Sequence, residues 1–137
     1  MAEGGTELVA SCICGRARIT MSRTPDYVGQ CNCSMCTKTG FRGVYYASDE
    51  LRIEGEFDSY VREDLDEVFL RLHRCKHCGV ATHWTPLSER PHERMGVNSR
   101  LVDQALLEGV EVRYVDGASW WRRCRLPSRL LAGRAPF

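Results

Sequence analysis

Apolar and polar residues alternate along most of this chain, in short runs that are typical of half-buried β-strands. The clearest runs are residues 16–21 and 110–115, in which charged and apolar side chains take turns. Runs of this length, separated by glycine, proline and acidic turns, favour antiparallel sheets over alternating strands and helices. The pattern predicts strands at residues 8–12, 16–21, 42–47, 51–54, 57–62, 67–72, 80–84, 93–97 and 110–115.

Two segments have a helical pattern instead. Residues 100–107 carry apolar side chains on one helical face, and Gly109 follows the end. Ser34 would cap a short helical turn over residues 35–39, which Gly40 would end. The sequence therefore predicts a mainly β fold with one or two short helices.

Cysteine content adds a chemical expectation to this fold. The 137 residues include eight cysteines, and seven of them lie in groups with C-x-C or C-x-x-C spacing. A disulfide-rich secreted scaffold is the first alternative, but we see no export signal, and a chain of this length buries a core without disulfides. The spacing is that of ligands to a soft divalent cation, and zinc is the favoured ion. The groups are Cys12 and Cys14, then Cys31, Cys33 and Cys36, then Cys75 and Cys78.

Seven thiols divide into a closed set of four and a set of three. The simplest partition keeps the three middle thiols together and joins the first pair to the last pair, in a site that contributes folding free energy. A set of three leaves one coordination position for water or substrate, which is typical of catalytic zinc. The spacing leaves open a different closed set, made of Cys12, Cys14, Cys31 and Cys33.

The order of these motifs resembles one family. C-x-C-G, then C-x-C-S-x-C, then C-x-x-C-G is similar to the glutathione-dependent formaldehyde-activating enzymes, which include centromere protein V-like proteins. The stretches at residues 96–98 and 116–121 also resemble the C-terminal half of that family. The resemblance implies a zinc-binding fold of packed, coiled antiparallel sheets. It implies a catalytic domain over residues 8–121. Residues 122–137 carry five arginines and no acidic residue, and we expect them to form a basic C-terminal tail.

The resemblance also implies two zinc ions per chain and a reaction. That reaction is the condensation of glutathione with formaldehyde to S-hydroxymethylglutathione, by a carbon–sulfur lyase. Asn32 stands where members often have histidine, so any acid–base role of that histidine has to fall to another group. By resemblance, the ligands of a structural zinc are Cys12, Cys14, Cys75 and Cys78, and those of a catalytic zinc are Cys31, Cys33 and Cys36.

Other residues have candidate roles beside the catalytic zinc. Three thiolates and a bound ligand thiolate would give the zinc site a net negative charge, and Lys38 and Arg42 are candidates to compensate it. Tyr45 and Tyr46 are neighbours on one expected strand, so they face opposite sides, and at most one of them lines a given pocket. The histidines are expected to be structural or exposed, and they are His73, His77, His83 and His92.

The overall charge limits the partners. With a formal net charge of +1 and no clustered basic and aromatic residues outside the tail, we expect neither nucleic-acid nor membrane binding. We expect a cytoplasmic protein that binds a small-molecule thiol such as glutathione, and the sequence sets no oligomeric state. Cys124 lies alone among arginines and is expected to be a bystander. The alternatives are a non-catalytic zinc-stabilised binding module and a redox protein whose three middle thiols form disulfides.

Overall fold

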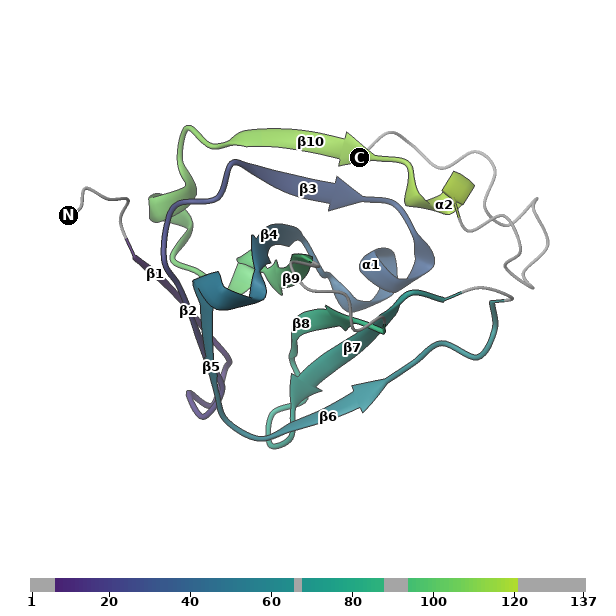
Figure 1. Cartoon of the computed structure of the whole chain (residues 1–137), viewed down its shortest axis with the longest axis horizontal. Coiled ribbons are helices and arrows are strands. Elements are labelled where there is room, and N and C mark those ends of the chain that lie inside the picture. Colours follow the sequence, from purple (N-terminus) through teal and green to yellow (C-terminus); the bar gives the residue numbers. More distant parts are fainter. Residues whose placement is uncertain (1–6, 66–67, 88–93, 121–137) are drawn as a thin grey trace.

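Two β-sheets and several short helices make up the fold in this computed structural model, which describes residues 7–65, 68–87 and 94–120 (Figure 1). The smaller sheet is antiparallel, with strand order β1-β2-β5. Its strands are β1 (Leu8–Ser11), β2 (Arg18–Met21) and β5 (Leu51–Glu54). The basic tail at 122–137 lies outside the described residues.

The larger sheet has seven strands in the order β10-β3-β4-β9-β8-β7-β6. Neighbouring strands are antiparallel except β10, which lies parallel to β3, so the sheet is mixed. The mainly β prediction is therefore confirmed, with one parallel pair that the sequence did not predict. The strands are β3 (Tyr27–Cys31), β4 (Gly43–Ala47), β6 (Phe57–Tyr60), β7 (Leu70–Cys75), β8 (Ala81–Pro86), β9 (Arg94–Asn98) and β10 (Glu111–Val115).

The main hydrophobic core takes side chains from both sheets. Alternation buries every second residue of β1 and, on β4, Val44 and Tyr46 on the same face, whereas β2 is buried throughout from Ile19 to Met21. Full burial of an aliphatic side chain contributes about 1.5–3 kcal/mol, so this cluster supplies much of the stability. Its buried members are Leu8, Ala10, Ile19, Met21, Val28, Val44, Tyr46, Val97 and Val102.

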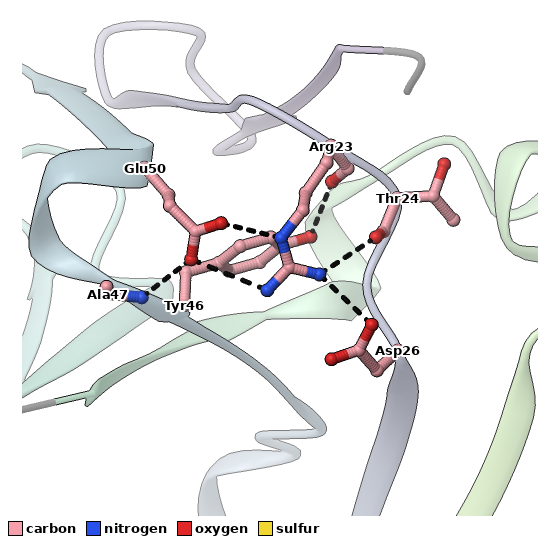
Figure 2. Close-up of polar contacts among 6 residues, drawn as sticks. All are labelled: Arg23, Thr24, Asp26, Tyr46, Ala47 and Glu50. Carbon is pink, nitrogen blue, oxygen red and sulfur yellow. Dashed lines mark hydrogen bonds and ion pairs between the residues drawn. The ribbon is translucent and has the colours of Figure 1, made fainter. Parts of the chain in front are cut away.

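A polar cluster joins the two sheets at one edge of this core (Figure 2). Arg23 follows β2, and its Nε donates to Oε2 of Glu50 at 2.6 Å. Glu50 ends the 3₁₀-helix η1 (Ser48–Glu50). The hydroxyl of Tyr46 on β4 donates to the carbonyl oxygen of Arg23 at 3.0 Å. The guanidinium of Arg23 holds the pKa of the Glu50 carboxyl below its usual range.

The helix predicted over residues 100–107 is wrong. Two 3₁₀-helices stand there instead, η2 (Ser99–Leu101) and η3 (Gln104–Leu107). The Asp103 side chain accepts from the Ala105 backbone nitrogen at 3.1 Å and caps η3. The Gln104 amide donates to the carbonyl oxygens of Ser99 and Val102 at 2.9 and 2.7 Å. These side chains compete for backbone groups that a continuous helix would pair internally.

The short helical turn expected over residues 35–39 is confirmed as α1 (Ser34–Thr39), and Gly40 ends it with a positive φ of 76°. A second short helix, α2 (Gly117–Trp120), follows β10. The strand expected over residues 67–72 runs from Leu70 to Cys75. None of the described helices has the length and apolar character needed to cross a bilayer.

Candidate metal centres

Four cysteines from two distant stretches of the sequence form one thiol group. Cys12 and Cys14 follow β1, Cys75 ends β7, and Cys78 lies in the loop before β8. Their Sγ atoms all lie within 4.8 Å of one another. The Sγ separations are 3.5 Å for Cys12–Cys14 and 3.7 Å for Cys14–Cys75. Tetrahedral zinc with Zn–S bonds of about 2.3 Å requires separations of about 3.8 Å, so this donor set fits a tetrahedral metal.

Backbone N–H groups support these thiols. The Ala17 nitrogen donates to Sγ of Cys12 at 3.2 Å, and the Cys78 nitrogen donates to Sγ of Cys75 at 3.5 Å. Such bonds favour a thiolate over a thiol. Gly79 closes the second loop with a φ of 79°, a conformation that glycine adopts without strain. The spacing therefore folds each pair into a loop that presents both sulfurs to one point.

The three middle cysteines form a second group, again with every Sγ within 4.8 Å of the others. Cys31 ends β3, Cys33 caps α1, and Cys36 lies in the first turn of that helix. The cap is therefore Cys33 rather than Ser34, because the Cys36 nitrogen donates to Sγ of Cys33 at 3.4 Å. Among the described residues, no fourth His, Cys, Asp or Glu joins this group.

Hydrogen bonds within this group favour the thiolate form of Cys31. The thiols of Cys33 and Cys36 hydrogen-bond to Cys31 and hold its pKa well below its usual range. The backbone nitrogens of Cys33 and Gly117 add hydrogen bonds to the same sulfur. The same interactions raise the pKa of Cys36. Three clustered thiols with such donors suit a soft cation, as the first group does.

The start of α2 closes over the three-thiol group. A Cβ at Gly117 would lie 2.4 Å from Sγ of Cys31, so only glycine allows this approach. Asn32 holds the segment in place, because its Nδ2 donates to Oδ1 of Asp116 at 2.9 Å. Its Oδ1 accepts from the Ala118 nitrogen, also at 2.9 Å. Sequence reasoning treated Asn32 only as a departure from the family and missed this role.

The sequence model described as glutathione-dependent formaldehyde-activating enzyme matches residues 7–120. The chain belongs to this family. The crystal structure of a Rhodobacter sphaeroides protein from structural genomics also matches, with a TM-score of 0.56 and 22% identity over 77% of this chain and 99% of that chain. That likeness shows a shared fold.

Aromatic side chains border the three-thiol group in this family member. Tyr46 lies in the core between the sheets, whereas Tyr45 packs into the cluster around Cys33, so the two face opposite sides as expected. A Cβ at Gly29 or Gly43 would lie 2.4 or 2.7 Å from the Tyr45 hydroxyl oxygen. These glycines therefore let the Tyr45 ring lie flat on the sheet. Burial, with the nearby thiols, raises the pKa of Tyr45, which keeps the phenol protonated.

Lys38 lies within α1, and Arg42 follows it. Lys38 is exposed in its last turn, two residues after Cys36, and helical residues at that spacing do not face each other. Arg42 follows the helix, and its Nε is buried without a hydrogen-bond partner in the described part of the chain. The compensating role of both residues stays a prediction.

Two of the four histidines stack on each other. The rings of His73 on β7 and His83 on β8 are nearly parallel, with centroids 4.4 Å apart. Burial, with His73 beside it, lowers the pKa of His83 to about 3. His77 is exposed, with Nε2 3.5 Å from Oε1 of Glu56. His92 and Cys124 lie outside the described residues.

Proposed function

We propose that this protein is a zinc-dependent carbon–sulfur lyase that acts on a thiol adduct, as in the condensation of glutathione with formaldehyde to S-hydroxymethylglutathione. The supporting observation is the three-thiol centre, which has no fourth ligand among the described residues. Two of its members, Cys31 and Cys36, are only half-buried, so a ligand has access. The four-thiol centre, which joins two distant loops, would be the structural site.

The residues of the catalytic centre have separate tasks in this proposal. Cys31, Cys33 and Cys36 would hold the zinc ion, which when bound favours the deprotonated form of a ligand thiol. Asn32 and Gly117 hold α2 against the centre, which fixes the position of Cys31. This second layer of contacts commonly tunes a metal site as strongly as the ligands do.

Addition of the thiol to formaldehyde requires a proton at oxygen. The sulfur forms a bond to the carbonyl carbon, the C=O π electrons move to oxygen, and that oxygen takes a proton from a donor. The proton that the thiol has lost then restores the donor. Asn32 is unavailable for this task because both its amide atoms bind the segment around α2. We propose Tyr45 as the donor, since its phenol packs into the same cluster as Cys31 and Cys36.

Metal content and turnover of two cysteine variants test the proposal. Purified wild type should contain about two zinc ions per chain and consume formaldehyde with glutathione faster than the uncatalysed reaction. Cys36→Ser should lose one zinc ion, glutathione binding and turnover while it keeps the far-ultraviolet circular dichroism of the wild type. Cys14→Ser, the matched change in the other centre, should lose one zinc ion and lower the unfolding midpoint.

Tyr45→Phe separates chemistry from binding. It should retain both zinc ions and bind glutathione normally, but turn over about 10²-fold more slowly, the lower end of general-acid effects. Wild type with two zinc ions and no formaldehyde consumption would contradict the enzymatic proposal and favour a binding module. Glutathione affinity unchanged in Cys36→Ser would contradict the assignment of the open site.

A further inference from the structure

A cavity of about 400 Å³ lies at the β6 edge of the larger sheet, three strands away from β3 (Figure 1). Its volume is within the range of small-molecule sites, about 300–1,000 Å³. Strands β6, β7 and β8, the end of α1 and the loop after Cys78 contribute to it, and no lining residue belongs to β3, β4 or β9. The lining includes Thr39, Tyr60, Leu72, Arg74, Val80 and Ala81.

Strand pairing places the lining side chains on one face of the sheet. Tyr60 on β6 lies opposite Leu72 on β7, and Arg74 on β7 lies opposite Ala81 on β8. Directly opposite residues share a face, and so do Leu72 and Arg74, which are two apart on one strand. The register of β7 against β8 shifts between His73 and Arg74. Irregularities of this kind often redirect a side chain next to a functional site.

Most of the lining is apolar. Leu72 and Ala81 pack against the buried cluster around Cys33, and Val80 packs against the buried cluster that contains Cys12 and Cys75. The cavity therefore lies between the supports of the two thiol groups. Tyr60 is 48% exposed and adds an aromatic side chain that a ligand can cover. A ligand with an apolar body gains free energy when it leaves water for such a lining.

The polar groups of the lining differ in what they leave free. The Thr39 hydroxyl donates to the Met35 carbonyl oxygen at 2.7 Å and accepts from the Phe41 nitrogen at 3.2 Å, so it is already paired. Among the described residues that line the cavity, Arg74 alone is charged. Its guanidinium forms no hydrogen bond within the described part of the chain. The five N–H donors of Arg74 are therefore available to a ligand, and their planar arrangement matches a carboxylate.

Asp58 limits the charge of that ligand. It lies opposite Arg74 on β6, and its Oδ2 is 3.9 Å from Nη2 of Arg74, beyond hydrogen-bond distance. Both side chains are 48% exposed, and an ion pair with this much solvent around it contributes little stability. A ligand carboxylate can thus become the closest partner of Arg74. Because Asp58 still offsets part of the positive charge, one carboxylate is favoured over a multiply charged anion such as phosphate.

We propose that this cavity binds a monocarboxylate with an apolar body, in particular a medium-chain aliphatic acid. Its carboxylate would lie on Arg74, and its chain would lie against Leu72, Val80 and Ala81. This ligand is distinct from the thiol of the proposed reaction, and its binding does not depend on that reaction.

Calorimetric titration of the zinc-loaded protein with octanoate tests the proposal. Wild type should bind one octanoate per chain, and the affinity should rise from butanoate through hexanoate to octanoate by up to about fourfold per added methylene group. Octanamide, which has the same chain without the charge, should bind about tenfold more weakly than octanoate. These comparisons use wild type alone, so they do not depend on how a variant folds.

Three variants test the role of Arg74. Arg74→Gln should bind octanoate about tenfold more weakly than wild type and lose the preference for octanoate over octanamide. The matched control is Arg71→Gln, which changes an exposed arginine on the opposite face of β7 and should leave octanoate binding unchanged. Asp58→Asn should have the opposite effect and bind octanoate about twofold to fivefold more tightly, because the competing carboxylate is gone.

Three results would overturn the inference. The first is no saturable binding of octanoate to wild type. The second is equal affinity of wild type for butanoate and octanoate, since an apolar cavity has to discriminate between them. The third is equal affinity for octanoate in wild type and Arg74→Gln, which would remove the anchor.

Discussion

Replacement of Gly117 by alanine tests how α2 controls the three-thiol centre. The added Cβ would lie 2.4 Å from Sγ of Cys31 and 3.2 Å from Cβ of Cys33. Ordinary van der Waals contact begins at 3.4 Å, so the overlap with the sulfur is 1.0 Å (3.4 minus 2.4). A metal-bound sulfur has little freedom to move, so α2 has to shift away.

The cost follows from the contacts that this shift breaks. The Gly117 nitrogen loses its hydrogen bond to Cys31, and Asn32 loses its bonds to Ala118 and Asp116. Each of these hydrogen bonds contributes about 1 kcal/mol net. Overpacking would cost about 1–3 kcal/mol, but part of that penalty is avoided because α2 moves away from the sulfur. We expect Gly117→Ala to lower the free energy of unfolding by about 2–3 kcal/mol. Metal affinity at the three-thiol centre should fall about 10–100-fold, as is typical when such supporting contacts are lost.

Chelator competition measures the effect. In the variant, about one zinc ion per chain should transfer to a chromophoric chelator at concentrations that leave wild type loaded, and the other should stay bound. Gly109→Ala is the control, because its φ of 83° is strained for alanine but no atom lies within 4 Å of the added Cβ. It should cost about 1 kcal/mol and leave metal release unchanged. Wild-type metal release from Gly117→Ala would refute the reasoning.

Three further predictions concern the core and its polar groups. Val97→Ala, at a fully buried core position, should lower the free energy of unfolding measured in urea by about 2 kcal/mol. Val112→Ala, at an exposed position on β10, should lower it by less than about 0.5 kcal/mol. Equal losses would contradict the assigned core. Tyr46→Phe should cost about 1 kcal/mol, because the hydroxyl bond to the Arg23 carbonyl is lost; an unchanged urea midpoint would show that this bond adds no stability. The folded state lowers the pKa of His83 from 6.5 to about 3. Between these two pH values the unfolded chain binds a proton at His83 and the folded chain does not. The free energy of unfolding therefore falls as the pH drops below about 6.5. At pH 5.5 this titration of His83 lowers the free energy of unfolding by about 1.4 kcal/mol. The stability difference between pH 7.5 and 5.5 should therefore shrink by that amount in His83→Gln. An unaltered difference would show that another group causes the pH dependence.

Local sequence determined the parts of the fold that depend on near neighbours. Alternation predicted most strands, because the side-chain period of a strand is a property of its own backbone. The C-x-C and C-x-x-C spacings determined that each loop presents its sulfurs together, since the turn that does this is only a few residues long. The short alternating segments correctly indicated a mainly β protein, and the motif order indicated the family that residues 7–120 match.

Pairings across long stretches of sequence were decided by the tertiary structure. Spacing alone left two partitions of the thiols open. The grouping of Cys14 with Cys75, 61 residues later, depends on how the two sheets pack, because β1 belongs to the smaller sheet and β7 to the larger one. Asn32 finds its partners 84 and 86 residues later because β10 pairs in parallel with β3, a pairing without a local signal.

The same distinction explains the aromatic residues and the wrong helix. Alternation set Tyr45 and Tyr46 on opposite faces, but packing of the smaller sheet decided that Tyr46 lies in the core and Tyr45 beside the thiols. In residues 100–107 the apolar period indicated a helix, yet side-chain bonds from Asp103 and Gln104 divided it. Sequence patterns report what a segment can form, whereas the packing free energy of the whole chain selects what it does form.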